Sequence, residues 1–351
     1  MKELKNFYEG KTILVTGGVG SIGSEIVRRV SEYNPKAVRV LDINETGLFN
    51  LEGELQSEKI RLFVGDVKDK DRLRRAVGGV DIIFHAAALK HVPLCEYNPF
   101  EAVKTNVYGT QNLIDVAMDE EIEKMVTIST DKAVNPINVM GATKLLAERL
   151  TISANFYKGW KKTSFSCVRF GNVLHSSGSV LPLFEEQIQK KFITLTDPDM
   201  TRFIMKIPQA IELILNATRM AKGGEIFTLK MPAVRVKDLA EAAIEELTPR
   251  YGHKPEEIEI KNIGRRAGEK MYEELMTEEE AGHAYEDEEM FVVLPQTFGA
   301  RGEISYKLPD NFKKSEKKEY SSKDVKLLTK EEVKAIIKKK KVTQNEKGSE
   351  K

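Results

Sequence analysis

Cysteine is scarce in this sequence, with Cys95 and Cys167 the two among 351 residues. Two cysteines cannot form the disulfide framework that stabilises small secreted domains. The five histidines and two cysteines show no spacing typical of a zinc site. We therefore expect both cysteines to be small buried hydrophobic residues, and we expect no metal site.

The sequence also lacks the apolar segments that membranes require. No run reaches the roughly 18–20 apolar residues that cross a bilayer. Residues 1–11 are charged and contain no apolar core of a signal peptide. These absences predict a cytoplasmic protein with no membrane span.

Neither sign of charge is in excess, because 55 Lys and Arg face 54 Asp and Glu. A net charge of +1 creates no field that would attract nucleic acid or an acidic membrane, so we expect neither partner. The distribution is uneven, since residues 311–351 hold 14 Lys against 7 Asp and Glu. We interpret that segment as a solvated helix followed by a frayed end.

Short β-branched runs alternate with longer helical patterns through the first 170 residues. Continuous apolar strands separated by helices indicate a parallel sheet covered on both faces. The sequence therefore predicts an α/β protein with a Rossmann-type doubly wound parallel sheet and a smaller C-terminal substrate lobe. The expected strands are 12–16, 37–41, 60–64, 81–85, 124–129 and 164–169, and the expected helices are 21–33, 99–118 and 140–157.

A glycine-rich turn, Gly17 to Gly23, follows the first expected strand and opens the first expected helix. Such a turn lets backbone amides approach a pyrophosphate at the helix N-terminus. Asp42 ends the second strand, where its carboxylate can accept both ribose hydroxyls of NAD and would repel the 2′-phosphate of NADP. We therefore favour NAD and keep NADP as the alternative.

Three more segments complete the expected cofactor site. Asp66 and Val67 follow the third strand and are placed to meet the adenine, Ala86 to Ala88 form a wall of small residues, and Asn106 either steadies the helix beneath the site or caps its interior. The residues expected to bind the cofactor are Thr16, Gly17, Gly20, Ser21, Ile22, Gly23, Asp42, Asp66, Val67, Ala86, Ala87, Ala88, Asn106 and Lys144.

The fifth strand leads into Ser129-Thr130-Asp131-Lys132-Ala133, at the sheet edge where ligands of such folds bind. Lys144 lies twelve residues after Lys132. In short-chain dehydrogenases a lysine at this place ends a Tyr-x-x-x-Lys motif, whose tyrosine comes four positions earlier. Here the tyrosine position holds Met140, whose thioether carries no proton at neutral pH. The expected catalytic residues are Thr130, Asp131, Lys132 and Lys144, with Met140 in the place of tyrosine.

With these motifs the chain resembles the UDP-N-acetylglucosamine 4,6-dehydratases of the extended short-chain dehydrogenase superfamily. The resemblance covers residues 12 to about 275. It rests on His85 to Pro93, Ser129 to Ala133, Met140 to Lys144, Arg169 to Val173, Ser176 to Val180, Thr196 to Phe203 and Arg266 to Lys270.

The resemblance implies oxidation of the sugar at carbon 4, elimination across carbons 5 and 6, and return of the hydride to carbon 6, with the NAD tightly bound and recycled. It implies that Lys132 is the base at carbon 5 and Asp131 the acid at carbon 6. Lys144 or Thr130 would replace the tyrosine at carbon 4. Inversion or retention at carbon 5 stays open.

The resemblance also implies a homo-oligomer and a site for the UDP-sugar, formed by Lys90, Asn172, Val180, Arg202, Arg266 and Glu269. We divide the chain into a dinucleotide-binding domain (1–170, rejoined by some later segments), a nucleotide-sugar lobe (171–310), a closing segment (311–342) and a disordered tail (343–351). The alternatives are an NAD-dependent UDP-sugar 4-epimerase and a non-catalytic, NAD-binding regulatory protein.

Overall fold

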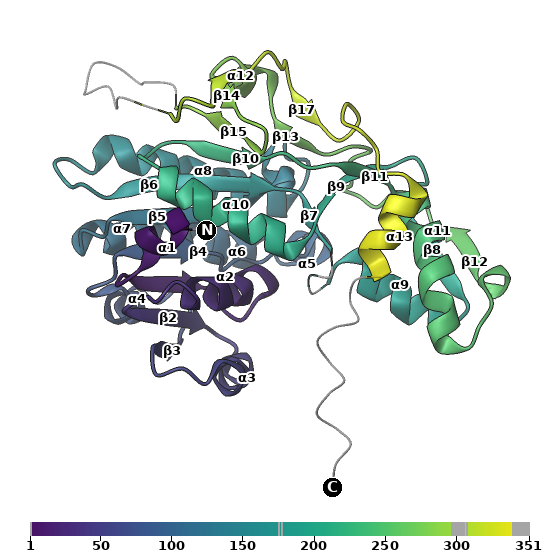
Figure 1. Cartoon of the computed structure of the whole chain (residues 1–351), viewed down its shortest axis with the longest axis horizontal. Coiled ribbons are helices and arrows are strands. Elements are labelled where there is room, and N and C mark those ends of the chain that lie inside the picture. Colours follow the sequence, from purple (N-terminus) through teal and green to yellow (C-terminus); the bar gives the residue numbers. More distant parts are fainter. Residues whose placement is uncertain (1, 175, 177, 296–305, 307, 339–351) are drawn as a thin grey trace, which may run out of the picture. The chain divides into compact units, whose positions relative to one another are not determined.

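The computed structural model describes residues 2–174, 176, 178–295, 306 and 308–338 (Figure 1). The chain forms two compact units. Unit 1 comprises residues 1–171, 207–230 and 274–320, and unit 2 comprises residues 172–206, 231–273 and 321–351. The later segments that rejoin the first unit are therefore 207–230 and 274–320, which narrows the lobe expected over 171–310. The expected tail at 343–351 lies outside the described residues.

Unit 1 is built on a ten-stranded sheet in the order β16-β14-β15-β10-β6-β5-β4-β1-β2-β3. The seven strands from β10 to β3 run parallel, and β15, β14 and β16 are antiparallel additions at one edge. The predicted α/β doubly wound fold is confirmed. The strands are β1 (Thr12–Thr16), β2 (Ala37–Asp42), β3 (Ile60–Val64), β4 (Ile82–His85), β5 (Lys124–Thr130), β6 (Ser164–Phe170), β10 (Ile226–Leu229), β14 (Ala284–Glu286), β15 (Met290–Val293) and β16 (Lys313–Lys314).

Helices cover both faces of this sheet. α1, α2 and α10 pack together on one face, and α4, α7 and α8 pack together on the other. From β1 to β3 the chain adds strands in one direction along the sheet, and from β4 to β6 it adds them in the other. Because the crossovers are right-handed in both halves, the helices of the two halves lie on opposite faces. The helices of unit 1 are α1 (Lys2–Tyr8), α2 (Ser21–Ser31), α3 (Glu45–Leu55), α4 (Lys70–Val77), α5 (Val92–Tyr97), α6 (Pro99–Ala102), α7 (Gly109–Asp119), α8 (Val139–Tyr157), α10 (Ile207–Met220) and α12 (Glu278–Ala281).

The helix expected over 99–118 is not uniform. It begins as α6, changes to a π-helical turn, η1 (Val103–Tyr108), and continues as α7. The apolar spacing did not reveal this change, because a single wide turn alters the register without breaking the pattern. π-Helical turns within α-helices occur frequently at functional sites.

Unit 2 is smaller and has its own core. A three-stranded sheet joins β11 (Ala233–Arg235), β9 (Thr201–Met205) and β7 (Asn172–Val173), and β12 (Glu259–Asn262) pairs in parallel with β8 (Phe192–Leu195). Buried apolar residues of α9 (Val180–Gln189), α11 (Val236–Leu247) and α13 (Lys330–Lys338) fill the space beside these strands. The remaining short elements are η2 (Asp131–Ala133) and β13 (Glu274–Met276) of unit 1, η3 (Thr248–Tyr251) and η4 (Pro255–Glu257) of unit 2, and β17 (Tyr320–Ser321) at the boundary.

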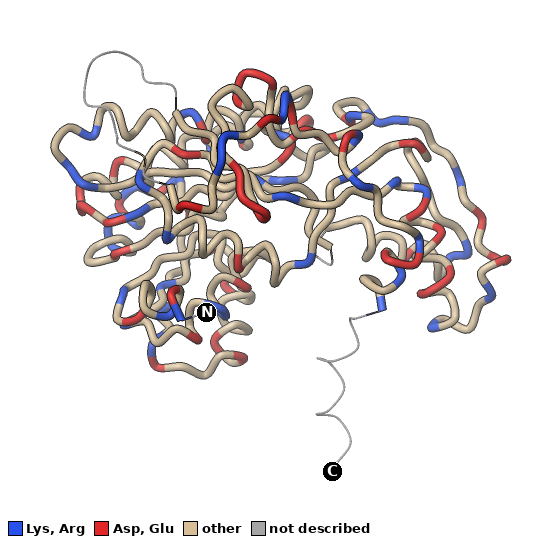
Figure 2. The backbone as a smooth tube through the Cα atoms, turned by 45° about the horizontal axis from the view of Figure 1, so that its top comes forward, with Lys and Arg blue, Asp and Glu red and all other residues tan. Residues whose placement is uncertain are grey.

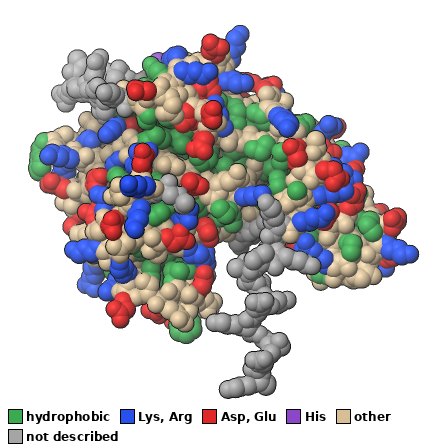
Figure 3. All heavy atoms as spheres, in the orientation of Figure 1, with side chains coloured by type: hydrophobic (Ala, Val, Ile, Leu, Met, Phe, Trp, Pro, Cys, Tyr) green, Lys and Arg blue, Asp and Glu red, His purple; other side chains and the backbone are tan. Residues whose placement is uncertain are grey.

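Charges of both signs are interspersed along the chain (Figure 2) and mix over the face drawn in Figure 3. Cys95 and Cys167 are buried and free, as the sequence predicted. No helix in the described part of the chain is long and apolar enough to cross a membrane. The described residues contain no group of three or more His, Cys, Asp or Glu side chains that could hold a metal ion.

Candidate active site

The glycine turn after β1 has a shape that only glycine permits. Gly17 has a φ of 65°, and a Cβ on it would lie 2.6 Å from the backbone nitrogen of Ala87. A Cβ on Gly23 would lie 2.2 Å from the carbonyl oxygen of Gly17. Gly20 caps α2 without a side-chain hydrogen bond. The start of α2 is therefore drawn tightly against β1, and no capping side chain satisfies the amides of its first turn, which suits a pyrophosphate.

Asp42 connects the end of β2 to this turn. Its Oδ2 accepts a hydrogen bond from the Val19 amide at 3.1 Å, and its Oδ1 accepts one from the Asn44 amide at 3.0 Å. Arg39, on the same strand, donates to the carbonyl oxygens of Ala76 and Gly78 at 2.7 and 2.8 Å. The Arg39 guanidinium thus binds the C-terminal end of α4. Asp42 is therefore the charged residue of β2 that lies beside the glycine turn.

A buried chain of hydrogen bonds joins β1, β4 and α7. The Thr110 hydroxyl donates to the carbonyl oxygen of Asn106 at 2.6 Å, so His85 Nε2 must donate to Thr110 Oγ1 across 2.9 Å. His85 Nδ1 then accepts from Thr16 Oγ1 at 2.8 Å. Burial, reinforced by the charge of Lys144, lowers the pKa of His85 to about 3. His85 is therefore neutral and holds Thr16 in place.

Asn106 lies in the π-helical turn and fastens the loop after β4. Its Oδ1 accepts from the Leu89 amide at 2.8 Å, and its Nδ2 donates to the Leu89 carbonyl and to Thr143 Oγ1, both at 3.0 Å. The Ala86 amide bonds to the carbonyl of Thr16 at 3.1 Å. The loop carrying Ala86 to Lys90 is thus tied both to β1 and to α8.

Asp66 and Val67 differ in their surroundings. Asp66 Oδ1 accepts from the Lys68 amide at 2.9 Å, and its other oxygen pairs with Lys68 Nζ at 3.3 Å. The Val67 side chain is buried in the core beneath the sheet. Any contact of Val67 with a ligand would therefore come from its backbone.

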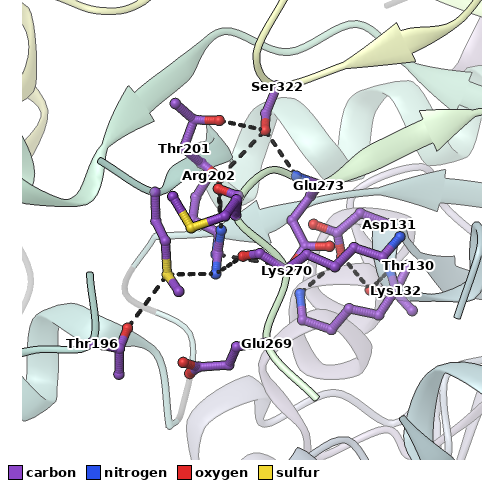
Figure 4. Close-up of polar contacts among 12 residues, drawn as sticks. Thr130, Asp131, Lys132, Thr196, Thr201, Arg202, Glu269, Lys270, Glu273 and Ser322 are labelled. Carbon is purple, nitrogen blue, oxygen red and sulfur yellow. Dashed lines mark hydrogen bonds and ion pairs between the residues drawn. The ribbon is translucent and has the colours of Figure 1, made fainter. Parts of the chain in front are cut away.

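The turn after β5 brings the predicted acid and base together (Figure 4). Asp131 is completely buried, and its Oδ1 accepts from Thr130 Oγ1 at 2.8 Å and from Lys132 Nζ at 3.0 Å. Its Oδ2 is buried and has no hydrogen-bond partner among the described residues. Gly141 makes this arrangement fit, since a Cβ there would lie 2.2 Å from the Lys132 carbonyl oxygen. The N-terminus of α8 can therefore lie directly against the turn.

Lys144 and Met140 both lie on α8 but have different partners. Lys144 is buried and donates from Nζ to the carbonyl oxygen of Ile128 at 2.6 Å. Burial lowers the pKa of Lys144, and the carboxylate of Glu148 opposes that shift. Met140 packs in an apolar cluster with Cys95 and Ala102. The tyrosine position is therefore occupied by a packing residue.

In unit 2, Arg202 is held by backbone carbonyl groups. Its guanidinium donates to Thr201 at 2.8 Å and to Lys270 at 2.9 Å, and its Nε lies 3.8 Å from a carboxylate oxygen of Glu273. Ser322 supports the same region, because its hydroxyl lies 2.8 Å from Thr201 Oγ1 and accepts from the Glu273 amide at 2.9 Å (Figure 4). The segment around Ser322 thus anchors the strand that carries Arg202.

The other predicted sugar-binding residues of unit 2 lie on β7, on α9 and in the loop after β12. Asn172 begins β7, and Val180 begins α9 at the edge of the apolar core. Arg266 is exposed, and its backbone amide donates to the Glu269 carboxylate at 3.2 Å, so Glu269 closes its own loop. Lys90, the remaining predicted cation, is exposed in unit 1.

Sequence reasoning missed a buried network behind Lys144. Arg169, at the end of β6, makes a paired contact with Glu148 on one side and with Glu280 on the other. The available signal was the position of Glu148, four residues after Lys144 and hence on the same face of α8.

The chain matches the family described as polysaccharide biosynthesis protein over residues 13–295. An uncharacterized membrane protein of Methanocaldococcus jannaschii is 66% identical over 338 residues, covering 96% of this chain and 98% of that protein. A UDP-N-acetylglucosamine 4,6-dehydratase (inverting) of Campylobacter jejuni is 38% identical over 318 residues, covering 87% of this chain and 92% of that protein. A UDP-glucose 4-epimerase of Rickettsia felis is 36% identical over 332 residues, covering 93% of this chain and 95% of that protein.

Among solved structures, Pen from Bacillus thuringiensis matches with a TM-score of 0.87 at 44% identity, covering 94% of this chain and 98% of that one. The names of the relatives include both a dehydratase and an epimerase. The choice between the two reactions therefore rests on the residues of the site.

Proposed function

Because the chain belongs to the family of polysaccharide biosynthesis proteins, we propose that it is an NAD-dependent nucleotide-sugar 4,6-dehydratase. Its substrate is UDP-N-acetylglucosamine, the sugar nucleotide named for the Campylobacter jejuni relative. The product is a UDP-4-keto-6-deoxy-N-acetylhexosamine, formed with loss of one water. The observation that carries the proposal is the buried Asp131 carboxylate, held at Oδ1 by Thr130 and Lys132 with Oδ2 left for a ligand. An epimerase needs no acid beside a base.

The residues of unit 1 fit NAD. The backbone at Gly17 packs against Ala87 so closely that a Cβ would clash, and α2 begins without a capping side chain. Asp42 supplies a carboxylate for the ribose hydroxyls, which favours NAD over NADP. Bound NAD would supply the hydride acceptor and donor at carbons 4 and 6, and Lys144 would hold the ribose beside the nicotinamide.

The proton movements can be assigned to three side chains. The Thr130 hydroxyl, which already donates to Asp131, takes the proton of the carbon 4 hydroxyl as it passes its own to that carboxylate. Asp131 then protonates the hydroxyl that leaves carbon 6 as water. Lys132, as the neutral amine, takes the carbon 5 proton and later donates a proton back to carbon 5, after its amine hydrogens have exchanged with solvent. The balance closes with one water released, and an acid and base side by side suit elimination.

Six side chains are assigned to the sugar nucleotide by their chemistry. We assign the diphosphate to the cations of Lys90, Arg202 and Arg266. Glu269 would accept ribose hydroxyls, and Asn172 and Val180 would contact the sugar-phosphate region. A homo-oligomer belongs to the same proposal.

The test is incubation with UDP-N-acetylglucosamine in heavy water, followed by NMR of the product. A new methyl group together with deuterium at carbon 5 supports a dehydratase, and the same spectrum gives the configuration at carbon 5. Lys132→Ala should release no keto sugar, whereas Lys190→Ala, which alters an exposed lysine paired with Glu186, serves as the control. Undiminished product from Lys132→Ala would refute the assigned base.

Two alternatives give different spectra. The relative named UDP-glucose 4-epimerase favours the first, and epimerisation would yield the 4-epimer without deuterium. A regulatory NAD-binding protein would bind the cofactor and leave the sugar unchanged.

A further inference from the structure

Four charged groups of alternating sign lie in a row inside unit 1: Lys144, Glu148, Arg169 and Glu280, here called the charge chain. Lys144 and Glu148 stand one turn apart on α8, Arg169 lies at the end of β6, and Glu280 lies on α12. The first three side chains are buried, and Glu280 is 13% exposed. The charge chain thus runs from the predicted cofactor lysine to the edge of the unit.

Arg169 is the centre of the charge chain. It donates from Nε and Nη2 to the two oxygens of Glu148 at 2.8 and 2.6 Å, and from Nη1 and Nη2 to the two oxygens of Glu280 at 2.8 Å. Nη1 also donates to the Leu275 carbonyl at 3.3 Å. Both carboxylates are therefore fixed, and the guanidinium has no donor left for another ligand.

Stability alone does not explain this network. A buried ion pair contributes less than apolar residues of the same volume in most cases, because both charges lose their hydration. The network does, however, neutralise itself around Lys144. Glu148 attracts the Lys144 ammonium, Arg169 alone would cancel that attraction, and Glu280 neutralises Arg169.

We propose that Glu148, Arg169 and Glu280 hold Lys144 as an ammonium ion in the folded protein. Glu148 and Arg169 are then positioning residues, and Lys144 binds the ribose as a cation and takes no proton from carbon 4. This assignment rests on the proposed function for what Lys144 binds, but the charge of Lys144 can be measured without cofactor. It leaves the proton of carbon 4 to Thr130.

The other titratable groups around Lys144 do not replace Glu148. His85, on β4, is neutral, and burial raises the pKa of the Cys167 thiol on β6, so that group is uncharged. Asp131 and Lys132, on the adjoining turn, already pair with each other at 3.0 Å. Glu148 is therefore the carboxylate available to Lys144.

The test measures unfolding by denaturant between pH 7 and pH 10 in the protein without cofactor. Burial already lowers the folded-state pKa of Lys144, so at this group the unfolded chain binds more protons, and Lys144 contributes a free energy of unfolding that grows as pH rises through this range. Glu148→Gln should lower that pKa further. The gain in the folding equilibrium constant from pH 7 to pH 10 should then exceed the wild-type gain by about tenfold for each additional pKa unit.

Two further variants assign the effect to Lys144. The extra gain should vanish in Lys144→Met/Glu148→Gln, and Asp81→Asn, which alters a carboxylate bonded to the Thr12 amide, should leave the wild-type pH dependence. If Glu148→Gln does not fold, Glu280→Gln is the substitute. Its gain in the folding equilibrium constant from pH 7 to pH 10 should also exceed the wild-type gain, by less than is expected for Glu148→Gln. Equal pH dependence in wild type and in both carboxylate variants would overturn the proposal, as would a gain that persists without Lys144.

A titration with NAD separates this inference from the proposed function. Wild-type protein that does not bind NAD would refute the function while leaving the pH result intact. NAD binding together with coincident pH profiles would refute the charge chain alone.

Discussion

Thr130 donates its hydroxyl hydrogen to the Asp131 carboxylate at 2.8 Å, and the second oxygen of that carboxylate lies buried without a partner in the described structure. A hydroxyl so placed can pass a proton to Asp131 as it receives one. This pair offers a proton path that does not involve position 140.

Thr130→Val should block that path while keeping the shape of the side chain. We expect kcat to fall about 10²- to 10⁴-fold, the usual contribution of a positioned proton-transfer group. NAD affinity should not change. Thr130→Ser keeps the hydroxyl and should retain most activity, so equal losses in the two variants would contradict the proton role.

Met140→Tyr should not create a more active enzyme. The Met140 side chain is 4% exposed and packs against Cys95 and Ala102, so a larger phenol would crowd this cluster and cost about 1–3 kcal/mol of stability. Met140→Leu, with similar volume, should cost less than about 1.5 kcal/mol. Thermal unfolding and kcat measure both effects; a stable Met140→Tyr protein with higher kcat would contradict this account.

Gly17→Ala should abolish NAD binding and destabilise unit 1. The new Cβ would meet the Ala87 backbone at 2.6 Å and would also sit at a positive φ. Gly79→Ala is the matched control, because Gly79 has a φ of 72° with open space around it. In either variant the positive φ should lower the free energy of unfolding by about 1–3 kcal/mol. Any further loss in Gly17→Ala measures the clash with Ala87. Equal losses would show that no close approach exists.

His85 should make the protein less stable in mild acid. Its folded-state pKa of about 3 lies below the ordinary value of 6.5, so the unfolded chain binds the extra proton as pH falls from 6.5 toward 3. Between pH 7.5 and pH 5.5 this contributes a loss of about 1.4 kcal/mol. Denaturant unfolding at the two pH values measures this loss of unfolding free energy. In His85→Gln the loss should be smaller than in the wild type by that amount. An unchanged difference would mean that His85 is protonated in the folded state.

Local patterns in the sequence predicted much of unit 1. The runs at 12–16 and 60–64 became β1 and β3 with the expected limits, and the family resemblance drawn from the motifs is confirmed. Each of these features depends on neighbours in the chain: apolar runs, glycine turns and residues that follow a strand.

The features that sequence reasoning missed depend on distant residues. Arg169 and Glu280 are 111 positions apart, and no local pattern pairs them. That some later segments rejoin the first domain is expected from the sequence, but their bounds are not, because 207–230 and 274–320 are placed in unit 1 by pairing of β10 with β6 and of β15 with β10. Asn106, in the π-helical turn, likewise bonds to Leu89 and Thr143, which are 17 and 37 positions away in the chain. The roles of the individual site residues stay predictions.

Unit 1 is assembled from three separate stretches of chain, and this has a consequence for its biosynthesis. A ribosome releases β6, with Arg169, long before it releases α12, with Glu280. At about 5–20 residues per second, the nascent sheet waits several seconds with its β6 edge open and Arg169 lacking one of its two carboxylates. During that interval the exposed edge is a template for wrong pairing, and it stays open until β10, in the second of the three stretches, is made.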